Sequence, residues 1–102
     1  MKTMILIPAL APGAELIDYL QALSDAQLGQ LVVVDDGSGP DYAPIFALAA
    51  QIPGCTVLRH EQNRGKGDAL KTGLRYFQEL PDRSEYNGVV TADATGSTAL
   101  PM

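Results

Sequence analysis

Apolar residues in this chain form short uninterrupted runs, separated by stretches in which they recur at helical spacing. Uninterrupted runs are typical of strands covered on both faces. They predict strands at residues 3–8, 31–35, 56–59 and 88–91. Periodic spacing predicts helices at residues 14–24, 42–51 and 67–80. The expected order is therefore β-α-β-α-β-α-β.

Local signals set the expected element ends. Pro8 should stop the first strand, because it has no N–H to donate to a sheet. Asp41 is a plausible N-cap for the second helix, and Pro44 fits its first turn. Gly73 should let the third helix lie close to the sheet. Residues 81–87 are expected to form a surface loop.

Strands joined by helices of this length pair in parallel through right-handed crossovers. We therefore expect an α/β, Rossmann-like fold of three α/β/α layers with a mainly parallel sheet. Polar loops follow all four predicted strands, at residues 9–13, 35–41, 60–66 and 92–96. Because these loops lie at one edge of a parallel sheet, they should face a common cleft.

Composition narrows the function classes. The chain has 102 residues, 46% of them hydrophobic, which indicates one small globular domain. A net charge of −5, with only seven Lys and Arg, argues against binding to nucleic acid or to an anionic membrane. The single cysteine, Cys55, allows no internal disulfide and is interpreted as a small buried thiol in a reducing cytoplasm.

The N-terminus resembles a short signal peptide, because Lys2 precedes the apolar run MILIPALA. Pro8 interrupts that run, however, and no polar cleavage region follows it. We favour a first core strand. The sequence contains no run near the roughly 20 apolar residues of a membrane span.

Asp35 and Asp36 end the most apolar run, LVVVDD, and lead into Gly37 and Ser38. Carboxylates at a strand end can accept hydrogen bonds from a base imide or from ribose hydroxyls, so the pair suits a nucleotide. The alternative is that these acids only cap the following helix.

Arg64 and Lys66 alternate with Gly65 and Gly67 just before a predicted helix. Glycines allow close backbone approach, and both the helix N-terminus and the cations favour a phosphate. The alternative is a flexible solvated loop. The spacing fits neither the P-loop nor the dinucleotide glycine pattern, which disfavours an ATPase or a dehydrogenase.

Asp93 follows the last predicted strand and would be the third acid of the cleft. Two phosphates beside three carboxylates require a divalent cation, and oxygen ligands suit Mg²⁺ or Mn²⁺. The alternative is a helix cap at the strand end. His60 has no visible partner and is interpreted as structural or surface-exposed. The four tyrosines are interpreted as packing residues.

Four segments in order carry a family resemblance: ILIPALAP, VVVDDGSG, LRHEQNRGKGDALKTGLRY and GVVTADA. Together they resemble family 2 glycosyltransferases of the GT-A fold, nearest to bacterial polyprenyl- or dolichyl-phosphate sugar transferases. The resemblance implies that Pro8, Ala9 and the segment from Asp35 to Ser38 lie at the base and ribose of a UDP- or GDP-linked sugar. Arg64, Gly65 and Lys66 would then lie near the diphosphate, and Asp93 would begin a metal-binding Asp-x-Asp motif.

The sequence departs from the family pattern in three places. Leu10 and Ala11 replace an aromatic and a polar or acidic residue, and Thr95 replaces the second metal-binding acid. The acceptor site and the general base would follow Met102, so no catalytic residue is assigned. We expect residues 1–95 to be the nucleotide-sugar-binding half of a GT-A domain, with 96–102 an atypical tail.

The leading hypothesis is thus a truncated glycosyltransferase domain, inactive alone, that binds a nucleotide sugar with a divalent metal. The full-length family would transfer the sugar to a lipid phosphate or a saccharide, in the cytoplasm or at the inner membrane face. An exposed sheet edge should lower stability or promote self-association. The alternatives are a non-catalytic nucleotide-binding or interaction module, and an unrelated flavodoxin-like phosphoryl-transfer domain.

Overall fold

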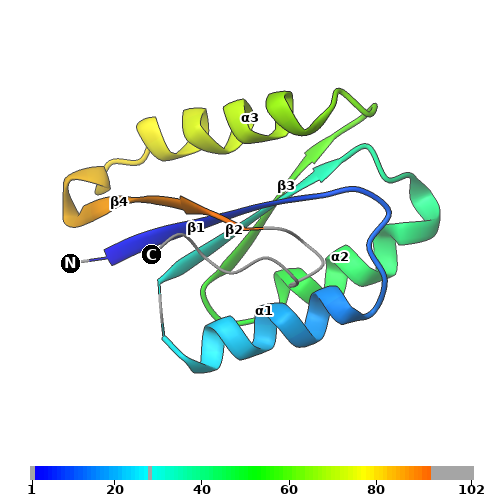
Figure 1. Cartoon of the computed structure of the whole chain (residues 1–102), viewed down its shortest axis with the longest axis horizontal. Coiled ribbons are helices and arrows are strands. Elements are labelled where there is room, and N and C mark those ends of the chain that lie inside the picture. The colour runs from blue at the N-terminus through cyan, green and yellow to red at the C-terminus, as the bar shows by residue number, and fades with distance from the viewer. Residues whose placement is uncertain (1, 28, 93–102) are drawn as a thin grey trace.

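A four-stranded parallel sheet forms the centre of the molecule (Figure 1). The computed structural model describes residues 2–27 and 29–92, so Asp93, Thr95 and the tail 96–102 lie outside the described residues. The strands are β1 (Lys2–Ala9), β2 (Gln30–Asp36), β3 (Cys55–His60) and β4 (Tyr86–Thr91). Their order across the sheet is β3-β2-β1-β4.

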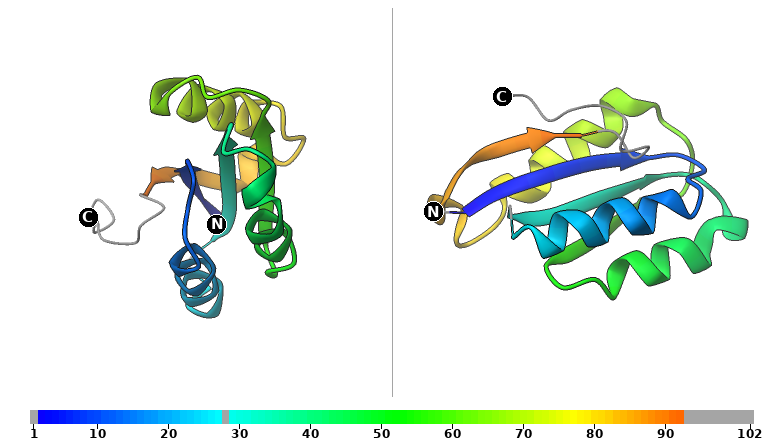
Figure 2. Two further views of the ribbon diagram at one scale, coloured as in Figure 1. Left: turned by 90° about the vertical axis from the view of Figure 1, so that its right-hand side faces the viewer. Right: turned by 60° about the horizontal axis from the view of Figure 1, so that its bottom comes forward.

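Helices cover both faces of this sheet. They are α1 (Glu15–Asp25), α2 (Ala43–Ala50) and α3 (Lys66–Gln78), with short 3₁₀ turns at η1 (Pro40–Tyr42) and η2 (Arg83–Glu85). α1 and α2 lie on one face and α3 on the other (Figure 2). The chain steps from β1 to β3 in one direction and returns across the sheet to β4. Right-handed crossovers in opposite directions place their helices on opposite faces, and the expected three-layer α/β fold is confirmed.

Pro8 does not end β1, contrary to the prediction, and the strand continues to Ala9. The carbonyl of Leu6 accepts a hydrogen bond from the N–H of Ala92 at 3.0 Å, so Leu6 faces β4. Pro8 faces the same side, because strand geometry repeats every two residues. The described β1–β4 pairs end at Leu6 and Thr91, so the missing N–H of Pro8 breaks none of them.

Two other local predictions were wrong. Asp41 is not the N-cap of α2, because it lies within η1 and Tyr42 holds the cap position without a side-chain bond. Pro44 does occupy the first turn of α2, as expected. The segment 81–87 is not wholly loop, since it contains η2 and the first residues of β4.

The two faces of the sheet have separate apolar cores. The core beneath α1 and α2 contains Ile5, Ile7, Leu31 and Val33, and Tyr19 and Tyr42 pack against it. The core beneath α3 contains Met4, Leu6, Val32 and Val34, and Tyr76 and Tyr86 pack against it. The packing role predicted for the tyrosines is confirmed. The apolar runs of β1 and β2 thus supply both cores, because successive side chains of a strand point to opposite faces of the sheet.

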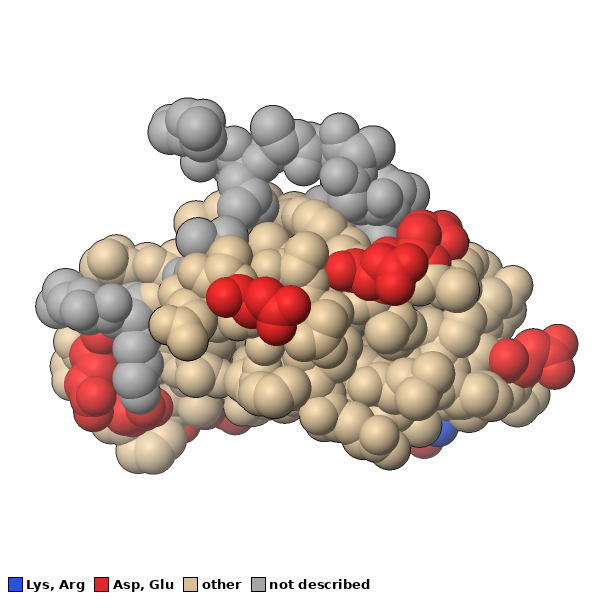
Figure 3. Space-filling model, turned by 90° about the horizontal axis from the view of Figure 1, so that it is seen from below, with Lys and Arg blue, Asp and Glu red and all other residues tan. Residues whose placement is uncertain are grey.

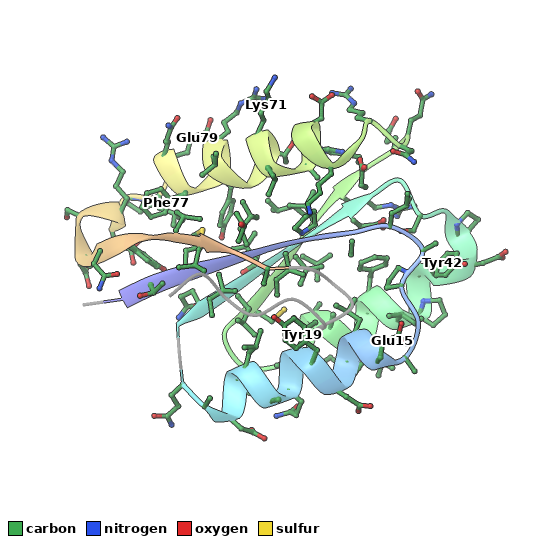
Figure 4. All side chains as sticks on the ribbon, viewed as in Figure 1. Glu15, Tyr19, Tyr42, Lys71, Phe77 and Glu79 are labelled. Atoms are coloured by element: carbon green, nitrogen blue, oxygen red, sulfur yellow. The ribbon has the colours of Figure 1, made fainter. Side chains whose placement is uncertain are left out.

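Helix α3 lies close to the sheet because Gly73 has no side chain. A Cβ at Gly73 would overlap the Leu6 side chain, which is fully buried. Further along α3, Phe77 points toward the sheet while Lys71 and Glu79 point away from it (Figure 4). The ring of Phe77 packs edge-on against Tyr86 at 5.5 Å, which ties α3 to β4. Among the described residues, no helix is long and apolar enough to span a membrane.

Gly73→Ala is predicted to lower the free energy of unfolding by about 1–3 kcal/mol, because the added methyl overpacks the Leu6 side chain. Gly67→Ala is the matched control on the same helix, where an added Cβ would meet no atom within 4 Å. That change should stabilise the chain by roughly 0.5–1 kcal/mol through helix propensity. Urea denaturation monitored by circular dichroism measures both, and equal effects of the two changes would contradict the packing.

Cys55, predicted to be a small buried thiol, is half-buried and packs against the α1–α2 core, and burial raises the pKa of its thiol to about 11. Because the thiolate is the reactive form, alkylation by iodoacetamide at pH 8 should be at least about tenfold slower in the native chain than in urea. Mass spectrometry of quenched samples measures both rates. Equal rates would show that the thiol is freely exposed in the native state.

Candidate functional site

The loops after β1, β2 and β3 meet at the carboxyl edge of the sheet, as the parallel topology predicts. Ser38 connects the first two, because its Oγ accepts a hydrogen bond from the N–H of Ala11 at 2.9 Å. The Ser38 N–H is in turn donated to Asp35 Oδ1 at 2.9 Å. The fourth expected loop, at 92–96, begins at the end of the described residues.

Asp35 and Asp36 do not line one cleft together, although the sequence suggested it. Both belong to β2, and successive side chains of a strand point to opposite faces. Asp35 lies on the α1–α2 face and holds the N–H of Ser38. Asp36 lies on the α3 face, where it contacts the loop that leads into α3. The two acids therefore act in different places.

The carboxylate of Asp36 is 3% exposed and accepts two hydrogen bonds on Oδ1. One comes from His60 Nδ1 at 2.9 Å and the other from the backbone N–H of Arg64 at 3.0 Å. Burial by itself raises the pKa of Asp36, but these bonds, a backbone contribution from Gly65 and the attraction of His60 outweigh burial. The net pKa is lowered, so Asp36 is ionised at neutral pH.

His60 is buried at 8% exposure and lies opposite Asp36 in the β2–β3 register. Because an ionised carboxylate only accepts hydrogen bonds, Nδ1 of His60 is the donor to Asp36. The other ring nitrogen, Nε2, lies 2.7 Å from Thr72 Oγ1 on α3. This pairing agrees with a structural role and links β2, β3 and α3 through one side chain.

Gly37 allows the second and third loops to touch. Its φ is 77°, in the left-handed region that favours glycine. A Cβ there would also overlap the backbone of Gln62 and Asn63. The loop after β3 thus packs directly on the loop after β2, beside the hydrogen bond from Arg64 to Asp36.

We call the first hollow at this edge the switch-point hollow, because it lies where β1 and β2 end beside the start of α3. It has a volume of about 270 Å³, and its lining consists of Pro8, Ala9, Leu10, Asp36, Asn63, Gly65 and Lys66. Five of these seven residues are among the predicted substrate-binding residues. Ligands of open α/β sheets bind beyond the carboxyl ends of the strands. The hollow lies at the end of β1, the strand that borders the reversal of strand order between β1 and β4.

We call the second hollow the arginine hollow. It has a volume of about 480 Å³, and its lining consists of Arg59, His60, Glu61, Gln62, Arg64, Thr72 and Arg75. Arg64 and Lys66, predicted to act together, therefore line different hollows. Asp35, Gly37 and Ser38 line neither of the two.

The described carboxylates do not form a metal site by themselves. Asp35 and Asp36 point to opposite faces, and each already accepts a backbone N–H. Within residues 2–27 and 29–92 there is no group of three acidic, histidine or cysteine side chains suited to a metal ion. Asp93, the predicted ligand, lies outside these residues, so no chemical step through a metal is derived.

Sequence reasoning missed Asn63, Arg59, Thr72 and Arg75 as lining residues of these two hollows. Asn63 lies within the loop that was singled out for its glycines and cations, so its amide was an available signal. Thr72 and Arg75 lie on a helix face whose neighbour is set by tertiary packing. No spacing in the sequence pairs them with Arg59 or His60.

The chain matches the model of a known protein family. Residues 5–94 match the family model described as glycosyl transferase family 2. The match spans the described strands β1 to β4 from Ile5 onward and all three helices. A search of curated proteins found no match.

Asp36→Asn is predicted to lower the free energy of unfolding by about 1–3 kcal/mol at pH 7, because a buried charge-assisted acceptor is lost. The folded-state pKa of Asp36 lies below its ordinary value of 3.8. The stabilisation is therefore fully present above about pH 5 and lost as the pH falls through the folded-state pKa. The wild type and the variant should thus converge toward pH 3.

Asp41→Asn is the control, because Asp41 is exposed on η1 and should change the unfolding free energy by less than about 0.5 kcal/mol. Urea titrations at pH 7, 5, 4 and 3 measure the three chains. A difference between wild type and Asp36→Asn that stayed constant down to pH 3 would contradict the role of the ionised carboxylate.

Proposed function

Because the chain belongs to glycosyl transferase family 2, we propose that its switch-point hollow binds the nucleoside diphosphate of an activated sugar. The resemblance to polyprenyl- or dolichyl-phosphate sugar transferases favours a UDP- or GDP-linked donor. The acceptor would be a lipid phosphate or a saccharide hydroxyl.

The observation that carries this proposal is the two-sided lining of the hollow. Pro8, Ala9 and Leu10 supply an apolar wall at the end of β1. Asn63, Gly65 and Lys66 supply polar groups opposite it, where α3 begins. A flat base suits the apolar wall, and a diphosphate suits a lysine at a helix N-terminus.

The size of the hollow fits part of such a ligand. Its volume of about 270 Å³ is just below the roughly 300–1,000 Å³ of typical small-molecule sites. A nucleotide moiety would fill it, and the sugar would extend beyond it. Ser38 and Asp35 would support the base side indirectly, since they hold the loop that contains Ala11 against β2.

Within this proposal, Asp36 is a positioning residue. Its Oδ1 already accepts hydrogen bonds from His60 and Arg64, so it fixes the loop that carries Asn63 and leads into Lys66 at the start of α3. Lys66 would pair with phosphate oxygens and would limit repulsion between them and Asp36.

A divalent cation held with Asp93 would offset the diphosphate charge and stabilise it as a leaving group. The described side chains that line the hollow offer binding groups and no free general base. A nucleotide-binding module without catalysis is therefore the second candidate, favoured by the engagement of both Asp35 and Asp36 in internal hydrogen bonds.

We predict saturable binding of UDP or GDP by isothermal titration calorimetry, strengthened by Mn²⁺. Lys66→Ala should weaken binding of the diphosphate by about tenfold, because one charge-assisted contact is lost. Lys71→Ala is the matched control, because it removes the same charge from the outward face of α3 (Figure 4) and should leave Kd unchanged.

Titration with UDP-glucose tests whether the sugar adds affinity. Binding of neither nucleotide, with or without Mn²⁺, would remove the proposed function. Equal weakening by Lys66→Ala and Lys71→Ala would show a general charge effect instead of a site.

A further inference from the structure

The arginine hollow is not used by the proposed function. It lies on the α3 side of the sheet edge, between the end of β3 and the first turns of α3. Three arginines line it, namely Arg59 on β3, Arg64 in the loop and Arg75 on α3. Segments separated in sequence thus bring three guanidinium groups to one hollow.

The charge at this hollow is opposite to that of the chain. The net charge is −5, yet all Lys and Arg other than Lys2 fall between Arg59 and Arg83. No Lys or Arg occurs in the whole segment 3–58, which includes α1 and α2. The outer face of α1 and α2 accordingly shows several acidic and hardly any basic side chains (Figure 3).

The three guanidinium groups are available to a ligand. Among the described residues, no hydrogen bond or ion pair engages the side chains of Arg59, Arg64 or Arg75. Glu61 is the one carboxylate in the lining, so cations outnumber anions there. Arg83, in contrast, donates a hydrogen bond to the carbonyl of Gln78 at 3.0 Å.

Two fixed polar groups complete the lining. His60 is more than nine-tenths buried and its Nε2 lies 2.7 Å from Thr72 Oγ1, and both residues border the hollow. Asp36 holds the His60 ring from behind through Nδ1. The hollow therefore combines buried and half-buried, hydrogen-bonded polar groups with exposed cationic side chains, a composition that suits a phosphate.

We propose that the arginine hollow binds a phosphate group, at a site separate from the switch-point hollow. The ligand class is a phosphate ester, either a soluble metabolite or a lipid headgroup. The guanidinium groups of Arg59 and Arg75 donate hydrogen bonds to the phosphate oxygens, and Arg64 contacts the phosphate from a third side. This site goes beyond the proposed nucleotide-sugar function, because it needs none of the apolar wall formed by Pro8 to Leu10.

The two hollows share a wall, so occupancy of one acts on the other. Asp36 lines the switch-point hollow, while its hydrogen-bond partners His60 and Arg64 line the arginine hollow. A phosphate that holds the Arg64 side chain also holds the loop that carries Asn63 and leads into Lys66 at the start of α3. Phosphate in the arginine hollow should therefore tighten nucleotide binding, and by linkage the nucleotide should tighten phosphate binding.

The test is a titration of the full chain with inorganic phosphate, followed by ¹H–¹⁵N NMR. Saturable shifts are expected for the amides of Arg59, Glu61, Thr72 and Arg75. The double variant Arg59→Gln/Arg75→Gln should weaken binding by at least about tenfold, because two charge-assisted contacts are lost. The control Arg83→Gln should leave Kd unchanged, because Arg83 lies outside the lining.

Lys66→Ala separates this proposal from the proposed function. This change should weaken nucleotide binding, while the amide shifts that phosphate causes at Arg59 and Arg75 should stay the same. Vesicles of phosphatidylglycerol, compared with phosphatidylcholine, distinguish a headgroup from a soluble phosphate when the Arg59→Gln/Arg75→Gln variant is run beside them. No saturable shift at these amides up to 20 mM phosphate, or equal weakening by Arg83→Gln, would overturn the proposal.

Discussion

The buried carboxylate of Asp36 is the interaction on which the edge of this sheet depends. It ends the most buried strand, and there it holds the His60 ring and the backbone of Arg64. A buried acid that lost these partners would have to be protonated or exposed, at a cost of several kcal/mol. Its lowered pKa shows that the hydrogen bonds more than offset burial. Both hollows inherit their shape from this arrangement, because their shared wall is the loop that Asp36 fixes.

Much of the fold could be predicted from the sequence, because the apolar pattern is strong where it matters most. The run before Asp35 indicates a strand buried on both faces, and β2 is such a strand. The spacing around Gly73 indicates a helix that lies close to the sheet, which α3 does. Predictions failed where a tertiary neighbour decides the outcome. Pro8 was expected to end β1 on chemical grounds, but the cost of its missing N–H depends on which neighbour that N–H would face.

The location of the candidate site was predictable from the sequence, but the contacts between its residues were less so. Parallel topology is enough to bring the loops after β1, β2 and β3 to one edge. It does not say that Asp35 and Asp36 face opposite sides, which follows only once both are known to belong to the strand. Nor does it pair Asp36 with His60, since that contact depends on the register between β2 and β3. The division of Arg64 and Lys66 between two hollows likewise depends on how the loop between β3 and α3 turns.

The separation of charge along the chain has a consequence for the whole molecule. Residues 3–58 carry six acids and no cation, whereas residues 59–85 carry six cations and five acids. The side of α1, where Glu15, Asp18 and Asp25 are exposed, is therefore negative, while the α3 side is close to neutral. A charged surface orients such a molecule before the two make contact. At low salt this electrostatic interaction extends over about 10 Å or more. A negatively charged partner would therefore meet the α3 side first, despite the overall repulsion. The hollows at the sheet edge, on that same side, would be presented to it in a defined orientation.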